Sequence, residues 1–247
     1  MKIGMISSGS SIHVKKIANA LIERGYEITL YTLPNHKKML QDLDHRVQVV
    51  KLPIKGKMGY VLNAHFIRKH LKKNPVDLIN THYASGYGTL ARLVGWHPTA
   101  LAVFGSDVYE YPFRSKFNMK TVIKNLDFSD VITSTSHVMA DKVREFYHRD
   151  RVIYVTPFGV DLNRFHPVQV EKDDYFEIGI VKKIEKKYGI DILIKAFAVF
   201  LDRNKYPKAR LMIYGRGNEM KGLMDLVKTL GGGYRPPFYL VGLCRMS

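Results

Sequence analysis

The chain has 247 residues, enough for one large domain or two modest ones, and 46% of them are hydrophobic, so it can bury a core. Its single cysteine, Cys244, excludes a disulfide framework and a cysteine-rich zinc site, and it suits a reducing compartment such as the cytoplasm. The net charge of +17 favours an anionic partner: nucleic acid, an anionic membrane surface or a phosphorylated small molecule.

Residues 1–160 alternate short β-rich runs with helical patterns. In chain order the patterns predict a strand at Lys2–Ser7, a helix at Ile12–Arg24, strands at Tyr26–Thr32 and Val47–Val50, a helix at Tyr60–Lys73, a strand at Val76–Asn80, a helix at Gly88–Val94, strands at Ala100–Phe104 and Val131–Thr133, a helix at His137–Tyr147 and a strand at Val152–Val155. This alternation favours a parallel sheet covered by helices, and therefore an α/β fold with one complete doubly wound domain.

The pattern starts again in residues 161–247 but is shorter. It predicts a strand at Glu177–Val181, a helix at Ile190–Leu201, a strand at Arg210–Tyr214, a helix at Glu219–Leu230 and a strand near Phe238–Val241. A doubly wound domain usually has about six strands. We therefore expect a second, incomplete domain. The chain contains no run of about 18 apolar residues and no apolar signal core at its start, so we expect neither a transmembrane helix nor a signal peptide.

Several motifs follow one another in a characteristic order. They are SSGSSIHVKKIANALIERGYEITLYT, INTHYASGYGTLARLVGWHPTALAVFGSDVYEYP, DFSDVITSTSHVMADKVREF, TPFGVDLNRFHP at Thr156–Pro167, and KKIEKKYGIDILIKAF. In this order and spacing the chain resembles the family 4 retaining glycosyltransferases. The resemblance implies the GT-B architecture, with two Rossmann-like domains that carry parallel sheets: an acceptor-side domain and a nucleotide-sugar donor domain.

The sequence departs from the family pattern at four places. The family's Glu-x7-Glu pair late in the second domain is absent, Phe104 stands where members often have histidine, Lys182 replaces an arginine, and Tyr188 displaces a lysine so that Lys187 is the nearest match. One interpretation is therefore that the chain is truncated within its second domain and inactive.

The resemblance implies transfer of a sugar from a nucleotide sugar to a glycan or lipid-linked acceptor, with retention of configuration. Lys182 and Lys187 are the candidates for the donor diphosphate, because cations stabilise the charge that develops on a leaving phosphate. The alternative for both is a solvated charge run. Gly9 and Ser10, in the loop before the first helix, are further phosphate candidates, and a plain turn with a serine cap is the alternative.

Asp107 and His82 each follow a predicted strand and are the candidates for contact with the acceptor. Asp107 could instead cap the next turn, and His82 could make a structural hydrogen bond. Gly215 and Gly217 resemble the family's turn at the nucleotide, with a tight turn as the alternative. His13 is expected at the surface, with a position facing the cleft as the alternative. No His, Asp or Glu cluster has metal-ligand spacing, so we expect no cofactor and no metal.

The segment Tyr60–Lys73 combines apolar residues with Arg68, Lys69, Lys72 and Lys73. Such a basic amphipathic helix could lie on an anionic membrane, which would place the protein at the inner face of the cell membrane. The alternative is a helix whose apolar stripe is used up by the core. Two other functions stay open: another α/β enzyme that binds a phosphorylated ligand, such as an epimerase, and a basic nucleic-acid-binding module, although no nucleic-acid reader motif is present.

Overall fold

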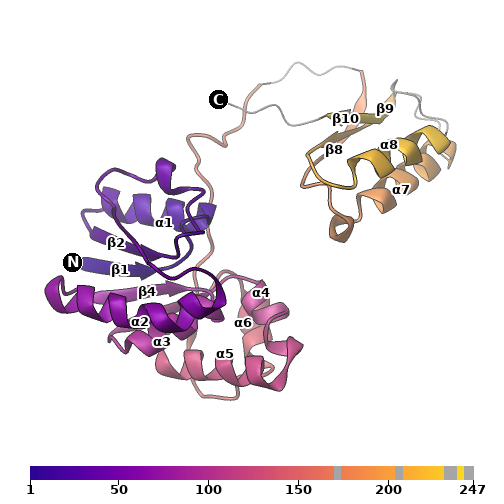
Figure 1. Ribbon diagram of the computed structural model, residues 1–247. Helices are drawn as coiled ribbons and strands as arrows, with labels where there is room; N and C mark the ends of the chain where they lie inside the picture. The colour runs from indigo at the N-terminus through magenta and orange to yellow at the C-terminus, as the bar shows by residue number, and fades with distance from the viewer. Residues whose placement is uncertain (170–173, 204–207, 231–237, 242–247) are drawn as a thin grey trace. The chain divides into compact units, whose positions relative to one another are not determined.

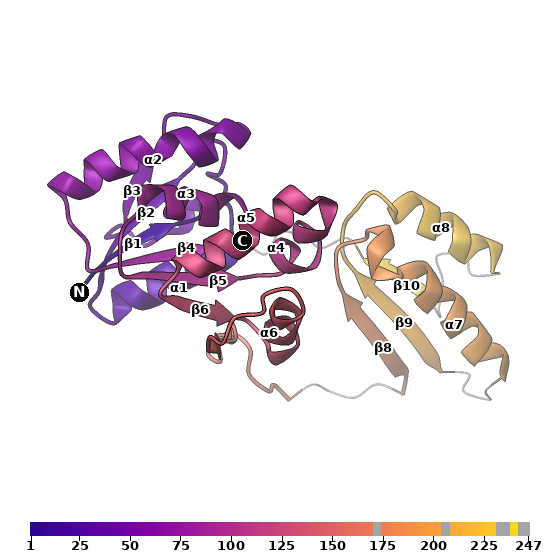
Figure 2. The same ribbon diagram turned by 90° about the horizontal axis from the view of Figure 1, so that it is seen from below.

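The computed structural model describes residues 1–169, 174–203, 208–230 and 238–241. The chain divides into two compact units, Met1–Leu162 (unit 1) and Asn163–Ser247 (unit 2), so the boundary falls at Leu162, against residue 160 expected from the sequence. Both units alternate parallel strands with helices, which confirms the predicted α/β fold (Figures 1 and 2). Cys244 and most of the Gly- and Pro-rich tail lie outside the described residues.

Unit 1 is built on a seven-stranded parallel sheet in the order β3-β2-β1-β4-β5-β6-β7. The strands are β1 Lys2–Ile6, β2 Glu27–Thr32, β3 Gln48–Lys51, β4 Leu78–His82, β5 Thr99–Val103, β6 Val131–Ser134 and β7 Ile153–Val155. The chain runs outward from β1 to β2 and β3, then crosses to β4 on the other side of β1. The junction of β1 and β4 is therefore the topological switch point, where α/β sheets bind ligands at the carboxyl ends of their strands.

The helices of unit 1 are α1 Ile12–Glu23, α2 Gly56–Lys73, α3 Gly86–Val94, α4 Ser106–Tyr109, α5 Lys116–Phe128 and α6 His137–Arg144, with short 3-10 turns at Leu40–Asp42 and Pro112–Arg114. Because side chains alternate across a strand, Ile3 and Met5 pack against α1, whereas Ile6 packs against α2 and α3. Helix α3 lies between α2 and α5 (Figure 2). Helices α5 and α6 share a further buried cluster with β5, β6 and β7.

Unit 2 is a three-stranded parallel sheet in the order β10-β9-β8 with two helices. Its elements are β8 Phe176–Val181, a 3-10 turn at Lys186–Tyr188, α7 Ile190–Arg203, β9 Ala209–Tyr214, α8 Met220–Thr229 and β10 Phe238–Val241. Ile194 and Phe197 of α7 and Leu223 of α8 pack on the buried side chains of β9. Every strand and helix predicted for this part of the chain is present, with ends shifted by a residue or two.

Candidate functional site

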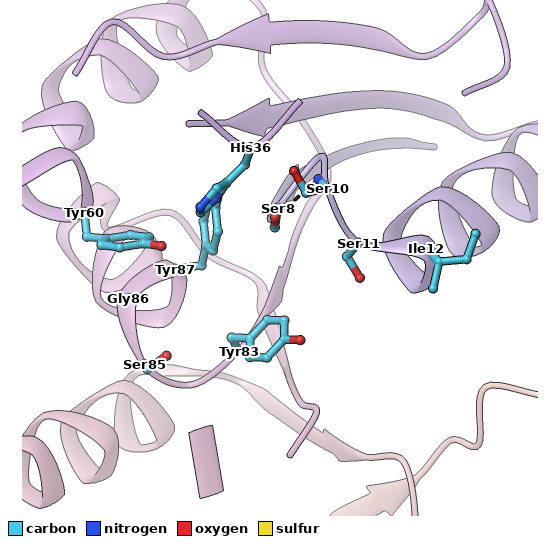
Figure 3. A pocket seen from close by; sticks show the side chains of 10 residues that line it. All are labelled: Ser8, Ser10, Ser11, Ile12, His36, Tyr60, Tyr83, Ser85, Gly86 and Tyr87. Carbon is cyan, nitrogen blue, oxygen red and sulfur yellow. Dashed lines mark hydrogen bonds between the residues drawn. The ribbon is translucent and has the colours of Figure 1, made fainter. Parts of the chain in front are cut away.

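A pocket of about 450 Å³ opens at the switch point of unit 1, where β1, β2 and β4 end. We call it the tyrosine pocket. Figure 3 shows serines from the β1–α1 loop on one side and Tyr60 and Tyr87 on the other, with Tyr83 below the serines in this view. Its lining comprises Ser8, Ser10, Ser11, Ile12, His36, Tyr60, Tyr83, Ser85, Gly86 and Tyr87. An aromatic wall with several hydroxyl groups suits a polyhydroxylated ligand that has an apolar face.

Hydrogen bonds and ring contacts fix one wall of the tyrosine pocket. The Tyr87 hydroxyl lies 2.7 Å from Nδ1 of His36 and accepts a hydrogen bond from the amide of Leu33. The Tyr60 ring packs edge-on against Tyr87 and lies so close to Gly86 that a Cβ there would be 2.8 Å from the ring. Burial raises the pKa of Tyr87 and lowers that of His36. Both groups are therefore neutral near pH 7.

Tyr83 has a strained backbone. Its φ of 72° lies in the left-handed region, and it is the only residue other than glycine with a positive φ in the described parts of the chain. Its ring packs against Phe104. Such strain persists only where the surroundings enforce it, and it clusters at functional sites. We take it as a second sign that this edge of the sheet binds a ligand.

Asp107 and Asn125 hold the loop that carries Tyr83 and Ser85. The Asp107 carboxylate, 1% exposed, accepts hydrogen bonds from the amides of Ala84 (2.7 Å), Gly105 (2.8 Å) and Phe104 (3.1 Å). Burial raises the pKa of Asp107, and these amides oppose that rise. Asn125 donates to the carbonyl oxygens of Ala84 (2.8 Å) and Ser85 (3.2 Å). These contacts give Asp107 a structural role, but its amide partners precede it in the chain and do not belong to the turn that follows it. A direct contact with an acceptor stays a prediction.

His82 lies buried beside the pocket, among aromatic rings. It is 1% exposed, it packs on Phe104 at 4.8 Å between the ring centres, and its Nδ1 has no hydrogen-bond partner among the described residues. Burial, with a smaller contribution from His13, lowers the pKa of His82 to about 3. His13 is half-buried, and its ring stacks on Phe158 at 3.6 Å between the ring centres. The acceptor role of His82 stays a prediction.

The loop after β1 is more tightly bound to its own domain than the sequence suggested. The Gly9 amide donates to Oγ1 of Thr32 (2.9 Å), and a Cβ at Gly9 would lie 2.5 Å from the carbonyl oxygen of His36. The Ser10 amide donates to Ser8 Oγ, and Ser10 Oγ accepts from the amide of Lys38. The Gly9 amide is therefore not free for an anion. The phosphate role of this loop stays a prediction, and it would rest on the first amides of α1.

In unit 2 the two predicted lysines flank an aromatic ring. Nζ of Lys182 lies 4.7 Å from the centre of the Tyr188 ring and Nζ of Lys187 lies 5.1 Å from it. Lys187 also pairs with Glu185 at 3.1 Å, which raises the pKa of Lys187. Lys182 follows β8 and Lys187 precedes α7, so both stand at the carboxyl edge of this sheet. Their side chains are exposed, and the phosphate role stays a prediction.

Gly215 and Gly217 allow two loops of unit 2 to touch. A Cβ on Gly215 would lie 1.9 Å from the carbonyl oxygen of Lys182, and one on Gly217 would lie 1.9 Å from that of Ile184. Ile184 also donates its amide hydrogen to the Arg216 carbonyl at 3.0 Å. The tight turn, which was the alternative interpretation of these glycines, therefore has a physical basis. It lets the loop after β9 contact the backbone of Lys182. Their nucleotide role stays a prediction.

Two features are absent from the described residues: a metal-binding cluster and a membrane-spanning helix. No group of three or more His, Cys, Asp or Glu side chains in these parts of the chain could hold a metal ion. No described helix is both long and apolar enough to span a bilayer. Metal-independent chemistry stays a prediction.

A family model identifies the family of this chain. Residues 2–136 match the model of the glycosyl transferase 4-like family, and the chain belongs to that family, as its motifs predict. A D-inositol 3-phosphate glycosyltransferase of Actinosynnema mirum is 25% identical over 97% of this chain, which spans 63% of that relative's length.

Solved structures show the same fold. Sucrose-phosphate synthase from Thermosynechococcus elongatus matches with a TM-score of 0.74 at 18% identity, over 99% of this chain and 71% of that one. Anabaena HepE in complex with UDP matches with a TM-score of 0.74 at 16% identity, over 99% of this chain and 70% of that one. The GT-B architecture expected from the motifs is therefore confirmed.

The sequence indicated the strand ends that bear the site but not the tyrosine pocket. Tyr60 was placed on a helix with a possible membrane role, and Tyr83, Tyr87 and His36 were not singled out. Their side chains converge only because β1, β2 and β4 are neighbours in the sheet. The one local signal was the row of small residues that follows β1.

Proposed function

We propose that this chain takes part in the transfer of a sugar from a nucleotide-sugar donor to a hydroxyl of a glycan or lipid-linked acceptor, with retention of configuration. The observation that carries the proposal is the family match together with a hydroxyl-lined pocket at the switch point. The solved structures of Anabaena HepE hold UDP or UDP-glucose, which supports a nucleoside diphosphate sugar as donor.

Each part of the reaction has a candidate group. Lys182 and Lys187 would neutralise the charge that develops on the leaving diphosphate. The tyrosine pocket would hold the acceptor, with the ring of Tyr60 against its apolar face. Asp107 is a positioning residue in this scheme, because it holds the Tyr83–Ala84 segment and is itself buried. A lipid-linked acceptor would place the reaction at the cytoplasmic face of the cell membrane.

Calorimetric titration of the full chain with UDP and with GDP tests the donor assignment. We expect one of the two nucleotides to bind, and we expect Lys182→Ala to weaken that binding by roughly tenfold or more, since a charge-assisted contact with phosphate contributes about 1.5–3 kcal/mol. Lys228→Ala on α8, another exposed lysine, is the matched control and should bind normally. Absence of binding for both nucleotides, or equal losses in the two variants, would contradict the proposal.

A further inference from the structure

Helix α2 exposes an apolar stripe that the core does not use. Met58 is 60% exposed, Val61 and Leu62 are each 47% exposed, and Phe66 is 44% exposed. The buried residues of the same helix, among them Ile67 and Leu71, point to the sheet instead. The alternative considered from the sequence, an apolar stripe used up by the core, holds for Leu71 but not for these four side chains.

The exposed stripe continues into a row of cations. At helical spacing, positions 58, 61, 62, 65, 66, 69, 72 and 73 fall on one face of α2, and all eight residues are exposed. The first half of this face is apolar apart from His65, and the second half is Lys69, Lys72 and Lys73. Helix α2 contains no Asp or Glu along its whole length. We call this the α2 face.

We propose that the α2 face binds the surface of an anionic lipid bilayer. An apolar stripe can enter the boundary between headgroups and acyl chains while neighbouring lysines pair with anionic headgroups. The net charge of +17 adds long-range attraction to such a surface. A second copy of this chain fits poorly as the occupant, because two α2 faces would bring six lysines of like charge together without a single carboxylate on either helix.

The same helix also supplies a wall of the tyrosine pocket. Tyr60 lies between Met58 and Val61 in the sequence, but on the opposite side of the helix from the α2 face. Its half-buried ring lines the pocket. Binding through the apolar half of α2 therefore keeps the pocket close to the bilayer. This part of the inference rests on the proposed function, and it favours the lipid-linked class of acceptor over a free glycan.

Flotation of the full chain with vesicles tests the inference without any use of activity. At low salt we expect binding to vesicles that contain phosphatidylglycerol and none to pure phosphatidylcholine. Replacing Lys69, Lys72 and Lys73 by Gln should weaken partitioning by about a hundredfold, because each cation near an anionic surface contributes about one kcal/mol. The triple variant Met58→Ser, Leu62→Ser, Phe66→Ser should also reduce it, by removing apolar burial.

The controls separate this inference from other outcomes. Val138→Ser on α6, where the side chain is 72% exposed, changes an apolar surface elsewhere and should float like the parent chain. Nucleotide titration of each variant shows whether the donor site is intact, so loss of flotation with normal UDP or GDP binding supports the α2 face. Equal binding to neutral vesicles, no effect of either triple variant, or a dimer that the apolar variant dissociates would overturn the proposal.

Discussion

Individual side chains at the carboxyl edge of unit 1 show why a local motif predicts a position better than a role. Asp107 and His82 end up where the strand pattern placed them, yet both are 1% exposed. The Asp107 carboxylate accepts hydrogen bonds from three backbone amides, and one of these, the amide of Ala84, is distant in sequence. No sequence pattern reports such a contact. The positive φ of Tyr83 was equally hidden, because tyrosine rarely adopts that conformation.

His82 makes the stability of unit 1 depend on pH. Its pKa is about 3 in the folded protein and 6.5 ordinarily, so the unfolded chain binds the proton more tightly and stability falls as the pH drops below about 6.5. Asp107, whose pKa is raised, acts in the opposite direction. We expect His82→Gln to flatten the decline between pH 6.5 and 4.5 by up to about 1.4 kcal/mol per pH unit.

Urea unfolding at several pH values checks this expectation. His148→Gln is the control, because it makes the same replacement at an exposed histidine of the same unit. A decline that is equally steep in the parent chain and in His82→Gln would show that protonation of His82 is not its cause.

At the scale of elements, helices with a strong apolar periodicity were predicted well, and a helix with a weak periodicity was missed. Helix α7 begins at Ile190 as expected, since its apolar stripe is wide. Helix α5 was not predicted, because only Val122, Asn125 and Leu126 are buried along its length and one of these is polar. Helix α2 begins at Gly56, four residues before the predicted start at Tyr60. The prediction left these residues out because Gly56 and Gly59 have low helix propensity.

The paired loops of unit 2 make a sharp prediction about two glycines. Gly215→Ala should destabilise unit 2 by about 2–3 kcal/mol, because its Cβ would collide with the Lys182 backbone and force it to move. Gly222→Ala on α8 should stabilise the same unit by about 0.5–1 kcal/mol, since an added Cβ would have no described atom within 4 Å and alanine favours helix. Thermal unfolding followed by circular dichroism distinguishes the two; a stable Gly215→Ala variant would refute the close loop contact.

At the scale of the whole molecule, the two units have separate buried cores. The clusters around Ile6, Leu101 and Met5 belong to unit 1, and the cluster around Ile194 belongs to unit 2. The motifs predicted this division because the α/β alternation starts again after the Pro-Phe-Gly turn. Their order, more than any single motif, identified the family.

Separate cores predict separate unfolding transitions. We expect calorimetry of the full chain to resolve two transitions, because cooperative unfolding is a property of each compact unit. Gly215→Ala should lower the midpoint of one transition only, and His82→Gln should change the pH dependence of the other only. A single transition that both variants shift together would show that the two cores unfold as one.

Among the described strands of unit 2, β8 lies at an edge of the sheet, and Phe176 and Val181 on it are 58% and 70% exposed. An open strand of this kind can pair with the same strand of another molecule. Lys182 and Lys183 follow it directly, and the net charge of +17 makes copies repel one another. Dissolved salt shortens the range of that repulsion to about 10 Å at 0.1 M ionic strength. Colloidal stability of the protein therefore depends on unscreened charge, and concentrated stocks will keep best at low ionic strength.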